Sequence, residues 1–587
     1  MKTQLLRTIV TPAAWRMDSE ADFFGDFDVV EEDDTCKDEL QSFGISTADY
    51  DTCLRVMQIV ADGGAPVANS AALREFRQIG MSIFHGDAAL VGQPYGGLTK
   101  SEYLLKLVQM RDRHAREQKA RALDRDMRNK RQLRAQRKEQ MAQLMGPPLQ
   151  SLIEYPVTET TPGSEGVLQS ETADSNNADA LFMELVQGRG TDGNNSGDQE
   201  QYFTYMSCYS CKKRFQEVHF FYDQLCGECA ALNWEKRNQT CDLTGYTAIV
   251  TGSRVKIGFH ITLKLLQWGC TVIATTRFPT DALERFTRQP DFNEWRDRLK
   301  IYALDLRDIA AVRAFCAWCG TNYPSLDILI NNAAQTVKRP PAYYRTLIAA
   351  EQKQLPLLEK SELDMLVHRS CGQELVPISA SAAEEAEEKE KRGDSGDLLL
   401  GEGEDDRYFP AGLVDEHGQQ VDLRGKNSWT MQIQEVNPLE LLEVHMVNAF
   451  SPFVLNGHLK TVLAARMNTR PWSYIVNVSA MEGKFYRHKT PNHPHTNMAK
   501  AALNMMTRTC AQEYATHQIA MTAVDTGWIT EENPVPIALR TRENNDFQTP
   551  IDEVDAAARI LDPIVHGLRT GTPQIGLFLK DYKESEW

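Results

Sequence analysis

The feature that most constrains the fold of this chain is the alternation of strand and helix patterns from Thr244 onward. The runs TAIVTG, TVIATTR, KIYALDL and LDILINNAA are rich in β-branched and apolar residues and have the length of buried strands. Helical stretches of roughly 10–20 residues separate these runs. Parallel strands need crossover connections of this kind, so the pattern predicts an α/β fold with a doubly wound parallel sheet.

The turn after the first of these strands is typical of phosphate binding. It reads TGSRVKIG and lies between the predicted strand and the predicted helix KIGFHITLKLLQWG. In that position, backbone N–H groups and the N-terminus of the helix face the pyrophosphate of a dinucleotide. The turn therefore predicts cofactor contacts by Thr251, Gly252, Arg254, Lys256, Ile257 and Gly258.

Further motifs follow the turn in a definite order. They are Asp305 after the third strand run, Asn331-Asn332-Ala333-Ala334, Asn448 in EVHMVNAFSPF, the run SYIVNVSA, Thr496-Asn497-Met498-Ala499-Lys500 and Val524-Asp525-Thr526-Gly527. Over residues 241–587 this series resembles the short-chain dehydrogenase/reductase (SDR) family, although Lys256 replaces the middle glycine of the family turn TGxxxGxG. The resemblance implies a Rossmann-type sheet, with Asp305 beside the adenine ring. It adds further cofactor contacts at Asn332, Ala333, Lys500 and Gly527.

The residues after the second strand run bear on the choice of cofactor. NAD-dependent enzymes usually place an Asp or Glu there to accept the ribose hydroxyls, but this chain has Arg277-Phe278-Pro279. An arginine can bind a 2′-phosphate, and Arg254 and Lys256 add positive charge nearby. The alternative is that Arg277 only extends into solvent at the strand end. We expect NADP, with NAD as the less favoured cofactor.

The catalytic positions that the resemblance implies are only half filled. In the family a Tyr phenol transfers the proton, a Lys lowers the pKa of that Tyr, a Ser orients the substrate carbonyl and an Asn supports a proton relay. Asn448 and Lys500 are present, whereas Ala480 stands at the Ser position and Thr496 at the Tyr position. The polar loop after Ala480 offers His495 and Tyr486 as replacement proton donors. The alternatives are that the histidine caps the helix or faces solvent and that Tyr486 packs.

These residues leave two functions open. The first is an NADP-dependent oxidoreductase that acts on an unknown carbonyl or alcohol substrate and uses a rearranged proton donor. The second is a catalytically inactive NADP-binding scaffold or redox sensor, because both catalytic hydroxyls are missing. The polar residues around the vacant positions favour the oxidoreductase.

A cysteine motif precedes the predicted sheet domain. Its spacing is Cys208-x2-Cys211-x14-Cys226-x2-Cys229, and two CxxC turns joined by a hairpin can present four thiolates to one tetrahedral Zn²⁺. With four protein ligands the metal is expected to be structural. The segment HFFYD is predicted to be a hairpin strand and ALNWEKR a short helix. A further pair, Cys316 and Cys319, lies in a helical pattern and is expected to pack in the core.

The remaining sequence divides by composition. We expect an acidic flexible tail (1–45), a helical region ending in a long charged helix from Ser101 to about Leu144 (46–148), a disordered linker (149–200), the zinc module (201–240) and the sheet domain (241–587). The sheet domain contains an insertion at about 336–436, whose acidic middle is expected to be disordered and whose aromatic flanks could cover the active cleft.

Charge and apolar content limit the partners and the compartment. The net charge of −17 and the lack of aromatic residues among the basic residues of the charged helix disfavour nucleic acid. No run has the ~18 apolar residues of a membrane span, and twelve cysteines in so long a chain suit reduced thiols and metal, so a cytoplasmic location is expected. A protein partner on the zinc module or charged helix, and a homo-oligomer, stay open.

Overall fold

The computed structural model describes residues 100–144, 200–368, 407–415, 417–467, 469–485, 489–530, 532–533, 535, 537–538 and 548–587. The chain divides into two compact units, Met1–Arg121 and Ala122–Trp587. In the first unit the described residues are the first part of helix α5 (Lys100–Asn129). The expected acidic tail, the linker and the acidic middle of the insertion lie outside the described residues.

A nine-stranded sheet forms the centre of the second unit, in the order β11-β10-β9-β8-β6-β3-β4-β5-β7. All neighbouring strands are parallel except β10 and β11, which pair antiparallel. This arrangement confirms the predicted doubly wound Rossmann-type sheet. The strands are β3 (Thr247–Thr251), β4 (Thr271–Thr276), β5 (Leu299–Ala303), β6 (Ile328–Asn331), β7 (Leu366–His368), β8 (Ser473–Ser479), β9 (Ile519–Asp525), β10 (Phe578–Lys580) and β11 (Lys583–Ser585).

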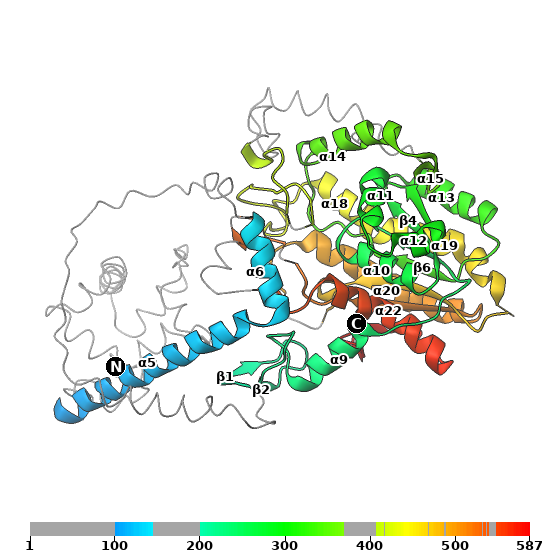
Figure 1. Cartoon of the computed structure of the whole chain (residues 1–587). Coiled ribbons are helices and arrows are strands. Elements are labelled where there is room, and N and C mark those ends of the chain that lie inside the picture. The colour runs from blue at the N-terminus through cyan, green and yellow to red at the C-terminus, as the bar shows by residue number, and fades with distance from the viewer. Residues whose placement is uncertain are drawn as a thin grey trace, which may run out of the picture. The chain divides into compact units, whose positions relative to one another are not determined.

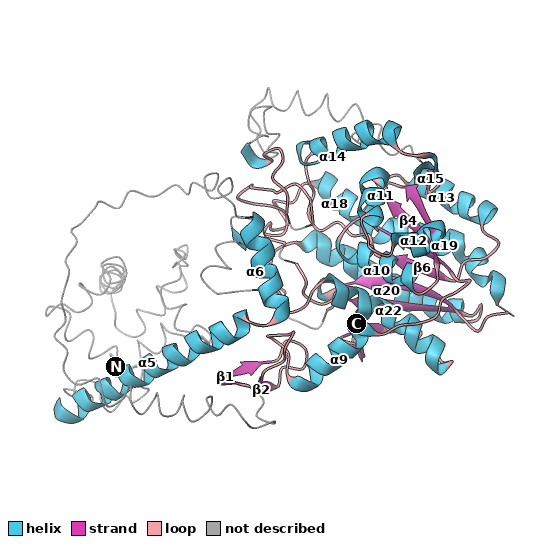
Figure 2. Ribbon diagram, viewed as in Figure 1, coloured by secondary structure: helices cyan, strands magenta, loops and turns pink. Residues whose placement is uncertain are grey.

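Helices cover both faces of this sheet, as Figures 1 and 2 show. One face packs against α10 (Lys256–Gln267), α11 (Pro279–Thr287), α12 (Phe292–Trp295) and α22 (Glu553–Thr570). The other face packs against α13 (Ile309–Asn322), α19 (Ser451–Leu463) and α20 (Pro494–Ala515). Cys316 and Cys319 lie buried in this second layer, as expected. Both faces are therefore apolar, which is why the strand sequences are continuous apolar runs rather than alternating ones.

The described parts of the insertion are ordered around the sheet. They include α14 (Pro341–Gln354), a 3₁₀ turn (Leu355–Leu357), α15 (Lys360–Leu363) and the edge strand β7. Strand β7 pairs parallel with β5 through Ile301 and Leu366, so the insertion extends the sheet by one strand. The chain returns through α18 (Pro438–His445) and a π-helical turn (Met446–Phe450) into α19.

The charged helix is interrupted rather than continuous. Helix α5 ends at Asn129, and α6 (Gln132–Leu144) begins after a short break. The backbone N–H groups of Gln132 and Leu133 donate to the carbonyl oxygens of Phe220 and Phe221. The expectation of one helix from Ser101 to Leu144 was therefore wrong, because tertiary hydrogen bonds replace helical ones at the break. No helix among the described residues is long and apolar enough to span a membrane.

The cysteine module folds as a small hairpin followed by a helix. Strands β1 (Gln201–Ser207) and β2 (Arg214–Glu217) pair antiparallel, and α9 (Gly227–Asn238) begins directly after Cys226, as predicted. The segment HFFYD is a turn and not the predicted strand. The His219 ring nitrogen accepts hydrogen bonds from the backbone N–H groups of Phe221 and Tyr222, which bends the chain there.

The module packs against α22 through buried polar contacts. The Tyr222 hydroxyl donates to Asp555 at 2.6 Å, and Arg237 forms ion pairs with Asp552 and Asp555. Apolar residues of the module join Ile551 and Ala556 in one cluster. The module is thereby fixed to the sheet domain.

Candidate functional site

The phosphate turn keeps the backbone of a glycine-rich turn although one glycine is missing. Gly252 has φ +70°, and a Cβ there would lie 2.9 Å from the Cα of Ala333. A Cβ on Gly258 would lie 2.0 Å from the carbonyl oxygen of Gly252. Lys256, at the middle glycine position of the family, also has a left-handed φ of 52°. Lys256 therefore adopts a left-handed backbone conformation that glycine would adopt without strain, and its backbone is strained.

Thr251 and Asn332 join this turn to the end of β6. The Thr251 hydroxyl oxygen accepts hydrogen bonds from the backbone N–H groups of Asn332 and Ala333, both at 3.0 Å. The Asn332 amide donates to the carbonyl oxygens of Thr251 and Gly252 at 2.9 and 3.3 Å. Ile257 is partly buried and packs against both the sheet core and the apolar cluster of the cysteine module. The predicted cradle residues thus lie together at the carboxyl ends of β3 and β6.

At the expected adenosine end, Arg277 contacts an aromatic residue of the insertion. Its guanidinium donates to the Tyr344 hydroxyl at 3.1 Å and lies 4.7 Å from the centre of the Tyr344 ring. Asp305 forms an ion pair with Arg307 at 2.6 Å. Burial raises the pKa of Asp305, but the hydrogen bonds and charge of Arg307 outweigh this effect and lower it overall. Asp305 is therefore an ionised carboxylate engaged by its neighbour.

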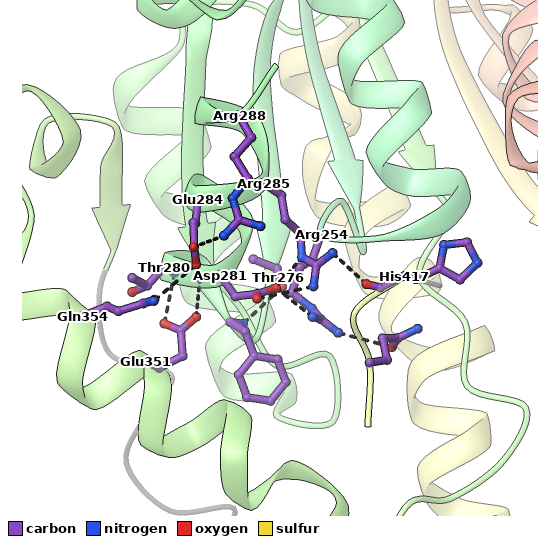
Figure 3. Close-up of polar contacts among 12 residues, drawn as sticks. Arg254, Thr276, Thr280, Asp281, Glu284, Arg285, Arg288, Glu351, Gln354 and His417 are labelled. Atoms are coloured by element: carbon purple, nitrogen blue, oxygen red, sulfur yellow. Dashed lines mark hydrogen bonds and ion pairs between the residues drawn. The ribbon is translucent and has the colours of Figure 1, made fainter. Parts of the chain in front are cut away.

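The N-terminus of α11, which follows β4, also contacts the insertion (Figure 3). The Glu351 carboxylate of α14 accepts hydrogen bonds from the backbone N–H groups of Thr280 and Asp281 at 3.0 and 2.7 Å. Arg254 of the phosphate turn forms an ion pair with Asp281 at 2.8 Å and donates to Gln419. The insertion therefore reaches the region where sequence reasoning placed the 2′-phosphate.

Lys500 lies on α20 and is 5% exposed. Its Nζ donates to the carbonyl oxygen of Val478 at 2.9 Å. Burial lowers the pKa of Lys500 to about 8, although the charge of Glu482 acts in the opposite direction. Asn448 lies buried in the π-helical turn, where its amide donates to the carbonyl oxygens of Gln335 and Val444. Both retained family groups are thus enclosed and held by backbone carbonyls.

The two altered family positions carry a methyl group at Ala480 and an aliphatic hydroxyl at Thr496. Thr496 precedes Lys500 by one helical turn, and its hydroxyl donates to the carbonyl oxygen of Thr336 at 3.4 Å. The neighbouring His495 is 2% exposed, and burial lowers its pKa, with Glu440 acting in the opposite direction. Ala480 offers no hydroxyl, and the Ser479 hydroxyl donates instead to Asn504 at 2.6 Å. Tyr486 lies outside the described residues.

The loop after β9 is attached both to the sheet and to the cysteine module. Asp525 forms an ion pair with Lys580 at 2.7 Å and accepts a hydrogen bond from the backbone N–H of Gly527. Gly527 has φ +80°, where a Cβ would lie 2.6 Å from Ile551. This predicted cofactor contact is therefore a turn that glycine alone accommodates without strain.

Glu532 brings a carboxylate toward the phosphate turn from the same loop. It accepts hydrogen bonds from the hydroxyls of Thr336 and Thr530 at 2.9 and 3.0 Å. Burial raises its pKa, but the charges of Lys256 and Arg339 dominate and lower it overall. An ionised carboxylate thus interacts with Lys256 near the expected pyrophosphate position.

The four cysteine thiols of the motif form one cluster. The sulfur atoms of Cys208, Cys211, Cys226 and Cys229 all lie within 4.8 Å of one another. The Cys211 and Cys226 sulfurs are 3.7 Å apart, and tetrahedral ligands at the usual Zn–S length of about 2.3 Å are separated by about 3.8 Å. The donor set and its spacing therefore fit Zn²⁺.

Sequence reasoning did not single out several residues that line this site. Glu351 and Tyr344 come from the insertion, and no motif marks them. Glu532 could have been found, because TEEN places carboxylates shortly after the last predicted strand. Tyr209, which contacts the loop after β9, lies inside the CxxC motif, and that motif indicates only a metal site.

The parallel sheet, its flanking helices and the turn after β3 define a Rossmann-type domain. The chain matches the description "short chain dehydrogenase" over residues 246–350 and "Enoyl-(Acyl carrier protein) reductase" over residues 425–556. The chain belongs to the short-chain dehydrogenase/reductase family. The two matched ranges flank the acidic part of the insertion.

Two relatives and one solved structure are similar to parts of this chain. An uncharacterized protein of Acanthamoeba polyphaga mimivirus is 31% identical over 371 residues, which cover 61% of this chain and 71% of the relative. The NADP-dependent 3-hydroxy acid dehydrogenase YdfG of Shigella flexneri is 31% identical over 140 residues, covering 23% of this chain and only 54% of that enzyme. An NADPH-bound carbonyl reductase from chicken fatty liver has 18% identity and a TM-score of 0.34, with 59% of this chain and 100% of that chain covered.

Proposed function

We propose that the chain binds NADP(H) in the cradle at the carboxyl ends of β3, β4 and β6 and interconverts a carbonyl and an alcohol. The cradle combines the close approach at Gly252 and Gly258 with the N-terminus of α10, which suits a pyrophosphate. Arg277 and Arg254 favour a 2′-phosphate over a ribose hydroxyl, and the matched hydroxy acid dehydrogenase is NADP-dependent by name. Bound NADPH would supply a hydride to the carbonyl carbon.

The observation that carries the catalytic proposal is the buried ammonium of Lys500, whose pKa is about 8. A proton donor works best when its pKa lies near the working pH, and a lysine brought down by burial meets that condition. Thr496 lies one turn earlier on the same helix, so its hydroxyl is proposed to pass the proton from Lys500 to the carbonyl oxygen. In this scheme a Lys–Thr pair replaces the family's Tyr.

His495 is the alternative donor. Its lowered pKa makes the imidazole mainly neutral at pH 7, which is unfavourable for donating a proton. Tyr486 stays a second alternative from the sequence. Carbonyl reduction that declines as the pH rises through about 8 supports Lys500 as the donor. A decline that begins at lower pH supports His495, because burial lowers the pKa of its imidazole.

The cysteine module is proposed to hold one structural Zn²⁺. All four positions around the metal would be filled by thiolates, which leaves none open for substrate. Because the module contacts α22 and the loop after β9, we propose that it stabilises the sheet domain.

A second candidate function is a nucleotide-binding sensor without turnover. Ala480 and Thr496 remove both family hydroxyls, and this observation favours it. The two candidates share the cofactor site but differ in chemistry. If the protein is a sensor, it binds NADPH, but no substrate oxidises the bound NADPH.

One experiment separates these functions. Purified full-length protein is titrated with NADPH and NADH by fluorescence and then mixed with a panel of aldehydes, ketones and 3-oxo acids while NADPH absorbance is followed. NADPH is expected to bind more tightly than NADH, and Arg277→Asp is expected to remove the preference. Binding without NADPH consumption on the whole panel would select the sensor.

A further inference from the structure

Helix α14 of the insertion places an acidic side chain on the N-terminus of α11. Glu351 is 9% exposed and accepts two hydrogen bonds there, from the backbone N–H groups of Thr280 and Asp281. Figure 3 shows the carboxylate pointing from α14 toward the start of α11. Such an N-terminus attracts anions through its N–H groups and its dipole, so Glu351 behaves as an internal anionic ligand.

Other contacts of the insertion occupy the arginines around this position. Arg277 donates to Tyr344, which also stacks against Phe278 with ring centres 5.8 Å apart. Arg254 donates to Gln419 in addition to its ion pair with Asp281. The groups expected to bind a 2′-phosphate are therefore already in contact with the insertion. Glu351 accepts from the N-terminus of α11, Tyr344 from Arg277 and Gln419 from Arg254.

The neighbouring contacts hold the two flanks of the insertion in place. Gln354, at the end of α14, donates to Glu284 of α11 at 3.2 Å. Arg285 of α11 donates to the carbonyl oxygen of His417 at 2.7 Å. Both flanks thus rest on the helix that follows β4 (Figure 3).

We propose that Glu351 takes the place of the NADP 2′-phosphate, so that the insertion sets the affinity and specificity for the dinucleotide. This inference rests on the proposed function, because it assumes that the cradle binds a dinucleotide. The 2′-phosphate of NADPH must displace a like-charged carboxylate from α11 before Arg254 and Arg277 can bind it. NADH carries no charge at that position and does not compete with Glu351. Binding of NADPH, and not of NADH, therefore releases α14.

The test compares Glu351→Gln with the native full-length protein. Glutamine removes the charge and keeps one of the two oxygens that now accept from the Thr280 and Asp281 N–H groups. It is therefore a conservative change in shape that tests the charge of Glu351. Dissociation constants for NADPH and NADH are measured by fluorescence titration at constant ionic strength. The NADPH constant is expected to fall about tenfold, and the NADH constant to change less than about twofold.

Glu284→Gln is the matched control. Glu284 lies on α11 in the same cluster but does not accept from the N–H groups at its start, so its charge change should alter NADPH affinity less than about twofold. An equal gain in Glu284→Gln would overturn the inference in favour of general electrostatics. Equal gains for NADPH and NADH in Glu351→Gln, or no change for either, would also overturn it.

Hydrogen exchange supplies a second readout. NADPH should speed amide exchange in residues 341–354 relative to the free protein, whereas NADH should leave it unchanged. Unchanged or slower exchange with NADPH would contradict the displacement. If neither dinucleotide binds the native protein or Glu351→Gln, the proposed function itself fails, which is a different outcome from a failure of the Glu351 inference.

Discussion

The Tyr209 hydroxyl accepts a hydrogen bond from the backbone N–H of Trp528 at 2.7 Å. Tyr209 belongs to the cysteine module, and Trp528 follows Gly527 in the loop after β9. The Ser210 hydroxyl adds a bond to Asp581 at 3.2 Å. The module therefore supports the loop that carries a predicted cofactor contact, although the two segments are far apart in the sequence.

Replacing Tyr209 with Phe should weaken this support without disturbing the thiol cluster. The Trp528 N–H loses its acceptor, which costs about 1 kcal/mol of unfolding free energy. The dissociation constant for NADPH should rise a few-fold, because the Gly527 turn becomes more mobile. Tyr205→Phe is the control, since Tyr205 is 66% exposed on β1. Equal NADPH affinity in both variants would show that the loop does not depend on the module.

Metal content provides a second prediction. The purified protein should contain about one zinc per chain, and Cys226→Ser should lose it. Loss of the metal should unfold the hairpin and expose Asp555 and Arg559, which the module now covers. The thermal midpoint of the sheet domain should then fall by several degrees. Freshly prepared, reduced protein without zinc would refute the metal assignment.

Lys256→Gly tests the strain in the phosphate turn. Glycine adopts the left-handed φ of 52° freely, so the variant should lose the backbone strain at this position. The greater entropy of the unfolded chain and the loss of the attraction between Lys256 and Glu532 oppose this gain, so the net gain should stay below about 1 kcal/mol. NADPH affinity should change as well, because the backbone can approach the pyrophosphate while one positive charge is lost. Lys256→Ala is the control, since it removes the charge but keeps the Cβ. Equal denaturation midpoints for these two variants would argue against strain at this position.

The pH dependence of stability tests the burial of Lys500. Its pKa of about 8 lies below the ordinary value of 10.5, so between these values the unfolded chain binds more protons than the folded one. The free energy of unfolding should therefore rise with pH in this window. Below pH 8 Lys500 is charged in both states, so its burial destabilises the folded protein by the full amount. Relative to Lys500→Met, the native protein should gain about 2–3 kcal/mol between pH 7 and pH 10. Parallel pH curves for the two proteins would contradict a buried ammonium.

The central strands of the sheet and the turn after β3 were predictable from the sequence because their signals are local, whereas the short edge strands β7, β10 and β11 were not predicted. The TGSRVKIG turn lies between its own strand and helix, and the Cys226 motif sits at the start of α9. The strand predicted at HFFYD failed because the side chain of His219 forms bonds that the apolar pattern does not reveal. The contact of Glu351 with α11 was not predictable, because it joins segments some 70 residues apart through one ordinary glutamate.

Thr496 provides the last prediction. If its hydroxyl relays the proton from Lys500, Thr496→Val should lower turnover by about 10²-fold and leave the dissociation constant for NADPH nearly unchanged. Thr496→Ser keeps the hydroxyl and should retain most of the turnover. In the native enzyme carbonyl reduction should decline as the pH rises through about 8, because the donor must be protonated, and in Thr496→Val this decline should disappear. His495→Phe should leave the decline in place. Full turnover in Thr496→Val would contradict the relay through its hydroxyl. Loss of the pH-dependent decline in His495→Phe would contradict Lys500 as the donor. Either result would favour His495 or Tyr486 as the proton donor.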